Sequence, residues 1–110
     1  MKLAVIGSRG IMIDNLEEYV GEEVKELVSG GAKGVDFCAK TYAQKKGLKI
    51  TEFLPDYKRF GRGAPLRRNL QIIEYSDAVL AFWDGKSKGT QYVIQESKRM
   101  GKPIIVHIIK

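Results

Sequence analysis

The sequence predicts an α/β fold, with one doubly wound parallel sheet of five strands and helices on both faces. Short apolar runs alternate along the chain with segments whose apolar residues recur at helical spacing. Glycine and proline separate most of these segments. A chain of 110 residues buries roughly 66% of the surface that its unfolded form exposes, which suffices for one core. We therefore expect residues 1–110 to form a single domain.

The first strand is expected at Lys2–Ile6, because this apolar run is typical of a strand buried on both faces. Asp14 and Glu17 have the spacing of a capping box, so a helix is expected to follow them. The second strand is expected at Glu26–Ser29, although this stretch could equally continue that helix.

The middle of the chain predicts a second helix and a third strand. Five residues recur at the three/four spacing of a core-facing stripe, namely Val35, Cys38, Ala39, Tyr42 and Ala43. Gly47 stands where a helix would end. The third strand is then expected at Lys49–Leu54.

The last part of the chain continues the alternation. A loop is expected at Pro55–Ala64, and Pro65 is a natural first residue for the next helix, which would turn Leu66, Leu70 and Ile73 inward. The remaining elements are expected at Ala78–Phe82 (strand), Thr90–Met100 (helix) and Ile104–Ile109 (strand).

Three turns that follow strands are rich in glycine: Gly7–Gly10, Gly30–Asp36 and Asp84–Thr90. Ligands of open α/β sheets bind beyond the carboxyl ends of the strands. A glycine turn that opens a helix directs backbone N–H groups and the helix dipole at one point, which suits a phosphate. The candidate ligand-binding residues of these turns are Gly7, Ser8, Arg9, Gly30, Gly31, Lys33, Ser87, Gly89 and Thr90. Alternatively, the glycines serve tight connections and the hydroxyls only cap helices.

Two common nucleotide motifs do not fit. The segment Gly7–Met12 lacks the G-x-G-x-x-G spacing, and the second strand ends in Ser29-Gly30 with no acid there to hold a ribose, which argues against a nicotinamide dehydrogenase. The triplet Gly85–Ser87 looks like the end of a P-loop, but Leu80 stands where that motif needs a glycine.

A basic segment without acids lies between Asp56 and Asn69, with Tyr57 and Phe60 interleaved. Its cations are Lys58, Arg59, Arg62, Arg67 and Arg68. Arginine forks suit phosphate oxygens and aromatic rings stack on bases, so the segment could serve a nucleotide or a single strand of nucleic acid. It could also be a solvated loop. The net charge of +6 points to an anionic partner.

No catalytic or metal-binding role is expected for the remaining reactive side chains. Cys38 lies on a core stripe, His107 lacks a second ligand at useful spacing, and no metal site is expected. Trp83 either faces a base or covers the sheet. With one cysteine, and no apolar run long enough for a membrane helix or a secretion signal, we expect a cytoplasmic protein without a membrane partner.

The order of four motifs resembles the SLOG superfamily, and more narrowly its YspA/YpsA-related branch, with similarity to the DNA-processing protein DprA. These motifs are Gly7-Ser8-Arg9, the run from Ser29 to Asp36, the pair Arg68-Asn69, and Gly85 to Thr90. The resemblance covers nearly the whole chain. It implies a Rossmann-like nucleotide-binding domain whose pocket would add Asp36, Arg68 and Asn69 to the residues above, and it makes a homo-oligomer plausible. No cofactor is identified beyond a nucleotide-type ligand.

The resemblance leaves the activity open. Lonely-guy phosphoribohydrolases of the same superfamily carry a P-G-G-x-G-T-x-x-E motif, but Val93 stands where that motif has its glutamate. Asp36 and Asp84 are the remaining candidate catalytic acids, and Asp36 could instead hold the glycine turn. We expect a sensor or carrier of a phosphate-bearing nucleotide or nucleotide derivative. The alternatives are a hydrolase that cleaves an N-glycosidic bond of such a ligand, and a protein that binds single-stranded nucleic acid.

Overall fold

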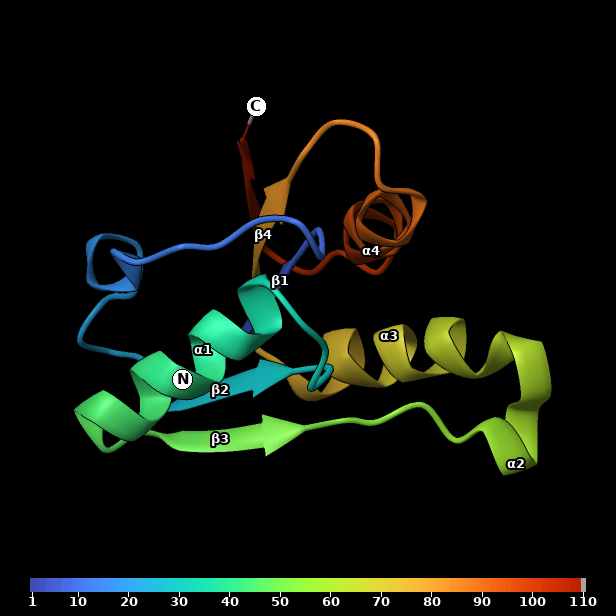
Figure 1. The fold of residues 1–110 in the computed structure, drawn as a ribbon, viewed down its shortest axis with the longest axis horizontal. Helices are drawn as coiled ribbons and strands as arrows, with labels where there is room; N and C mark the ends of the chain where they lie inside the picture. Colours follow the sequence, from blue (N-terminus) through green and yellow to red (C-terminus); the bar gives the residue numbers. More distant parts are fainter. Residues whose placement is uncertain (110) are drawn as a thin grey trace.

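The computed structural model describes residues 1–109, and at its centre lies a sheet of five parallel strands (Figure 1). The strands are β1 (Lys2–Gly7), β2 (Glu26–Ser29), β3 (Lys49–Glu52), β4 (Ala78–Trp83) and β5 (Ile104–Ile108). Their order across the sheet is β3-β2-β1-β4-β5, and all four neighbouring pairs are parallel. The predicted α/β sheet is therefore confirmed, and the chain direction across the sheet reverses between β1 and β4.

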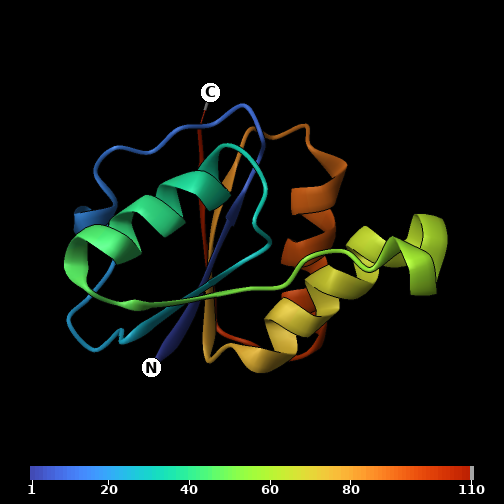
Figure 2. The same ribbon diagram turned by 60° about the horizontal axis from the view of Figure 1, so that its bottom comes forward.

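Helices cover both faces of this sheet, as the sequence predicts. The helical elements are α1 (Val35–Lys46), α2 (Tyr57–Phe60), α3 (Ala64–Tyr75), α4 (Lys88–Arg99) and the 3-10 turns η1 (Leu16–Glu18) and η2 (Gly61–Gly63). Figure 2 shows the sheet nearly edge on, with α1 on one side and α3 and α4 on the other. Within the described residues, no helix is long and apolar enough to cross a membrane.

Each face of the sheet has its own core, because alternate residues of a strand point to opposite faces. Leu3 and Val5 of β1 pack with Phe82 of β4 on the face that α1 covers. Ala4 and Ile6, which alternate with them, pack on the face that α3 and α4 cover. The strands β1 and β4 are thus buried on both sides, which fixes the position of their carboxyl ends.

The connection from β1 to β2 differs from the expected helix. Only the single turn η1 forms there, and Asn15 precedes it instead of Asp14. Asn15 Nδ2 donates a hydrogen bond to Glu18 Oε2 at 2.6 Å. Leu16 is 2% exposed and packs into the core on the α1 face. Outside η1 the connection consists of turns and irregular segments whose residues Ile11 and Val24 also pack into this core, so the expected helix is reduced to a single turn. Glu26–Ser29 is a strand and not a continuation of that helix.

The segment after β3 also differs from expectation. β3 ends at Glu52, two residues before the predicted end, and the expected loop at 55–64 folds into α2 and η2. Asp56 caps α2, since its Oδ1 accepts a hydrogen bond from Arg59 N at 3.2 Å. Residues 56–67 project beyond the sheet in Figures 1 and 2, and we call them the arm.

Candidate functional site

A cleft of about 510 Å³ opens at the carboxyl ends of β1, β2 and β4. It lies where the strand order reverses, which is where open α/β sheets bind ligands. Ten of the predicted ligand-binding residues line it: Gly7, Ser8, Arg9, Gly30, Asp36, Arg68, Asn69, Ser87, Gly89 and Thr90. The candidate acid Asp84 lines it too. Turns that lie far apart in the sequence therefore share one cavity.

The turn after β1 is tied to the turn after β4. Ser8 is 3% exposed, and its backbone N–H donates to Phe82 O at 3.1 Å. Its side-chain Oγ accepts a hydrogen bond from Asp84 N at 3.3 Å. Gly7 lies so close to Val35 and to the Phe82 carbonyl that a Cβ would fall 2.5 to 2.8 Å from them. These contacts hold the ends of β1 and β4 and the start of α1 together.

The turn after β2 is built around Asp36 and Arg68. Asp36, in the first turn of α1, is 8% exposed and accepts a hydrogen bond from Ala32 N at 3.1 Å. Burial raises the pKa of this carboxyl, while the Ala32 N–H and the Arg68 charge act against that rise. A Cβ on Gly30 would collide with the Arg68 guanidinium and would lie 3.1 Å from Asp36 Oδ2. Glycine at position 30 therefore lets the two charged groups approach the same backbone.

Arg68 reaches across from α3 to the ends of two strands. Its Nη1 donates to Gly30 O at 2.8 Å and to Phe53 O at 3.4 Å, and its Nε donates to Asn69 Oδ1 at 2.9 Å. Within residues 1–109 these bonds leave Nη2 without a partner. Burial lowers the pKa of Arg68, and the Asp36 charge opposes that change. Arg68 thus both fastens the wall of the cleft and brings a cation into it.

The turn after β4 is held by its own side chains. Asp84 Oδ1 accepts hydrogen bonds from Lys86 N at 2.8 Å and Ser87 N at 2.7 Å, and these bonds lower the pKa of Asp84. Ser87 caps α4 by accepting from Thr90 N at 3.4 Å. The Trp83 indole donates to Ser87 O at 3.0 Å. Asp84 therefore shapes the turn, and Trp83 fixes it from outside the cleft lining, so the sheet-covering interpretation of Trp83 is the one the contacts support.

Two long helices start at the cleft. Asp36, in the first turn of α1, and Gly89 and Thr90, in the first turn of α4, all line the cavity. The unpaired N–H groups and the positive dipole end of a helix favour anions. Arg9 and Arg68 add two cations, whereas Asp36 and Asp84 already accept backbone N–H bonds. The cleft is accordingly suited to a negatively charged ligand.

Two predicted residues lie outside the lining. Gly31 has a φ of +69° and its backbone N–H donates to Ser29 Oγ at 3.4 Å, so it serves the turn. Lys33 is exposed and does not line the cleft. The residues of this turn that do line the cleft are Gly30, Ala32 and Asp36, so Gly31 and Lys33 face away from it.

An apolar wall was missed by sequence reasoning. Pro65, Leu66 and Ile72 of α3 line the cleft together with Val93 of α4. Leu66 was expected in the core, but it is 45% exposed, and Ile72 is buried in its place. Only the helical spacing of these residues could have indicated a common face, and spacing does not say whether that face meets the sheet or a cavity.

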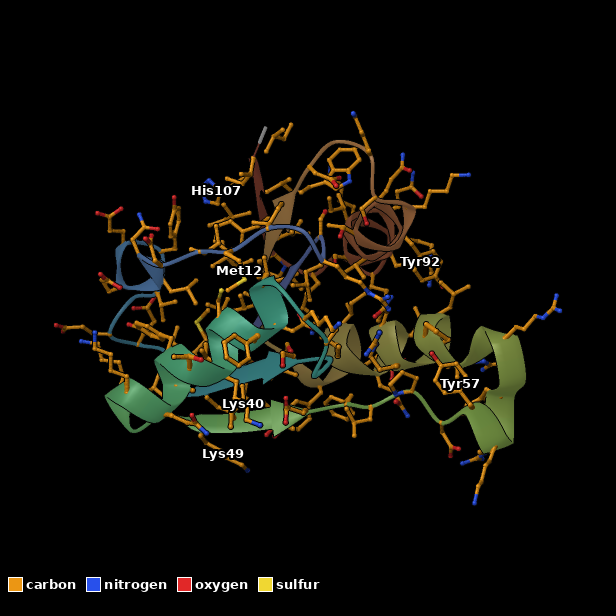
Figure 3. All side chains as sticks on the ribbon, in the orientation of Figure 1. Met12, Lys40, Lys49, Tyr57, Tyr92 and His107 are labelled. Carbon is orange, nitrogen blue, oxygen red and sulfur yellow. The ribbon has the colours of Figure 1, made fainter. Side chains whose placement is uncertain are left out.

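Cys38 and His107 are structural. Cys38 is buried in the core, where its Sγ accepts a hydrogen bond from Ile13 N at 3.2 Å. His107 of β5, marked in Figure 3, stacks on Phe82 with ring centroids 5.6 Å apart, and Tyr19 meets it edge on at 4.8 Å. Neither side chain lines the cleft.

The chain is similar to the X-ray structure of TM1055, a structural genomics target. The TM-score is 0.71 at 18% sequence identity, and the match covers 94% of this chain and 71% of that one. At this identity the similarity shows the fold alone, which is Rossmann-like. No protein-family model matches the chain, and no curated protein matches it.

Proposed function

We propose that this protein binds a phosphate-bearing nucleotide or nucleotide derivative in the cleft, as a sensor or carrier. The observation that carries the proposal is the meeting of three glycine-rich turns, after β1, β2 and β4, in one cavity. The first turns of α1 and α4 offer N–H donors to a phosphate there, and Arg9 and Arg68 offer charge.

The remaining walls of the cleft suit the base of a nucleotide. Pro65 and Leu66 give an apolar surface against which a base can lie, and Asn69 offers an amide beside it. A volume of about 510 Å³ is in the range typical of small-molecule sites, roughly 300 to 1,000 Å³. Membership of the SLOG superfamily is part of the proposal. It is supported by the order of the sequence motifs and by their position around the cleft.

Thermal unfolding with a panel of nucleoside mono-, di- and triphosphates tests the proposal. A ligand at about a hundred times its Kd adds roughly 2.7 kcal/mol, which shifts Tm by on the order of 10 °C in a domain of this size. The substitution Arg9→Ala should shrink that shift, since a charge-assisted contact is worth roughly 1.5 to 3 kcal/mol. The matched control is Arg99→Ala, because Arg99 is an exposed cation at the far end of α4. An Arg9 variant that responds like the parent contradicts the assignment of this residue.

A hydrolase is the second candidate, and Asp36 is the observation that favours it. A carboxyl group that is nearly buried, has a raised pKa and lies beside an arginine in a cleft is typical of catalytic acids. Incubation with nucleoside monophosphates should then release free base, and Asp36→Asn should abolish the release. If the parent releases neither base nor phosphate while it still gains stability, the protein binds the ligand without turnover.

The proposal also includes a cytoplasmic location, which the composition supports, and a homo-oligomeric state, which the SLOG resemblance supports. Sedimentation velocity over a range of protein concentrations measures the number of subunits, and a mass that stays at 12.4 kDa throughout contradicts the oligomer.

A further inference from the structure

The arm carries a positive surface that is separate from the cleft. Its exposed cations are Lys58, Arg59, Arg62 and Arg67, none of which lines the cavity. No acidic residue occurs between Asp56 and Glu74. Folding thus divides the basic segment of the sequence: Arg68 turns toward the cleft, and the other four cations stay in solvent.

Two of these cations contact the same aromatic ring. The guanidinium groups of Arg59 and Arg67 lie over the same ring, that of Phe60, at 5.2 and 5.3 Å from its centroid. In the described part of the chain, neither is ion-paired with a carboxylate. Both side chains are exposed, so each guanidinium is held by the ring and can still donate to a phosphate oxygen.

An exposed aromatic ring belongs to the same helix as two of these charges. Tyr57 is 60% exposed and directly precedes Lys58 and Arg59 in α2. Figure 3 marks Tyr57 on α2, at the projecting end of the molecule. Because α2 and η2 contain no buried residue, packing in the core does not dictate the composition of residues 57–63.

We propose that the arm binds single-stranded nucleic acid, with its four cations on the phosphates and Tyr57 stacked on a base. Arginine forks match phosphate oxygens, and an aromatic ring in solvent can stack on bases that are not paired. A duplex hides the faces of its bases, so Tyr57 would add nothing there. A membrane surface is disfavoured, because α2 has four residues and forms no amphipathic helix. This inference concerns a second surface and goes beyond the function proposed for the cleft.

Fluorescence anisotropy with a labelled oligothymidylate of about 20 nucleotides tests the proposal. If four phosphates are neutralised, log Kd should change with log salt concentration by a slope of about 0.7 × 4, or roughly 2.8. A duplex of equal length should bind more weakly than the single strand. No binding at low salt, equal binding of the duplex, or equal competition by polyglutamate would each overturn the proposal.

Variants separate charge from stacking. The double substitution Arg59→Ala, Arg67→Ala should weaken binding about 10-fold or more at about 0.1 M salt and reduce the slope by about half. Tyr57→Leu should weaken binding about 5-fold or more and leave the slope unchanged. The matched control is Lys40→Ala, Lys46→Ala, which removes two exposed cations of α1 and should retain the parent's affinity. Equal losses in the control and the arm variant contradict a site on the arm.

The two proposals fail independently. The Arg59/Arg67 variant should unfold at the parent's Tm, since the arm has no buried residue in α2 or η2, and should keep the full nucleotide-induced shift of Tm. If this variant loses oligonucleotide binding but keeps the nucleotide-induced shift of Tm, the result supports the arm as the nucleic-acid site. Parent protein that shows the nucleotide shift but no oligonucleotide binding overturns the arm alone, and the reverse pattern overturns only the cleft.

Discussion

Gly34 connects the turn after β1 to the start of α1, and its conformation predicts a large cost for any side chain. Its φ of +72° and ψ of −124° are nearly restricted to glycine, and a Cβ there would strike the backbone of Arg9 and Ile11. We expect Gly34→Ala to destabilise the fold by on the order of 3 kcal/mol or more, because backbone cannot move aside as a side chain can.

Gly47→Ala is the matched control for this substitution. Gly47 has a φ of +69°, but a Cβ at this position would meet no heavy atom within 4 Å. Gly47→Ala should therefore cost only the strain of a left-handed alanine, about 1 kcal/mol. Urea unfolding of both variants measures the difference. Equal losses would mean that the turn after β1 can yield, and that it does not hold the cleft in place.

Single residues of the site were predictable where their role is local. Ser87 is recognisable as a helix cap, and Gly30 as a turn glycine, because the chemistry of a turn depends on adjacent residues. Leu66 was misplaced because its exposure depends on where α3 packs. Lys33 was included because its charge fits a phosphate, yet the direction of its side chain follows from the path of the chain toward α1.

At the scale of elements, Glu26 ties β2 to β3 and α3. Its Oε2 accepts hydrogen bonds from Tyr75 at 2.6 Å and Thr51 at 2.7 Å, and Lys49 lies 3.8 Å from its Oε1. Burial opposes ionisation of Glu26, but these hydrogen bonds and the charges of Lys49 and Lys2 outweigh it and lower the pKa. The ionised carboxylate therefore stabilises the junction of the three elements.

Tyr75→Phe tests this junction, because it removes the hydroxyl and keeps the ring. We expect a loss of roughly 1.5 to 3 kcal/mol in the free energy of unfolding at neutral pH, as for a hydrogen bond to a charged group. A lowered pKa means that the stabilisation is complete above the usual value of 4.5 and disappears as the pH falls through the folded-state value. The loss should therefore shrink in acid. Tyr92→Phe on α4 is the control, and an equal, pH-independent loss in both variants contradicts the role of Glu26.

Elements were predictable where a periodic pattern runs through them. α1 and α4 were found within about two residues, because their apolar stripes and end residues agree. The helix predicted after Asp14 was wrong, because a capping box indicates where a helix can begin but not that it continues beyond its first turn. Residues 55–64 were expected to form a loop, because Gly61 and Gly63 are typical of loops and the sequence pattern gave little sign of the single capped turn of α2.

On the scale of the whole molecule, the cleft lies across the centre of the sheet. The turn after β2 belongs to the half that contains β2 and β3, and the turn after β4 belongs to the half that contains β4 and β5. β1 lies between these halves and pairs with both β2 and β4. A ligand that fills the cleft must therefore contact both halves at once.

Hydrogen exchange measures this bridging directly. With the nucleotide that shifts Tm most, present at about a hundred times its Kd, exchange should slow by up to about 100-fold in turns that open locally when the ligand is absent. We expect this protection at 30–36 and 84–90 together, because both turns line the same cavity. The turn at Gly101 lies at the opposite edge of the sheet, between the end of α4 and the start of β5, and should exchange at its original rate. Protection of only one of the two turns would mean that the ligand lies to one side of the point where the strand order reverses, and the phosphate would then have only one helix start to bind.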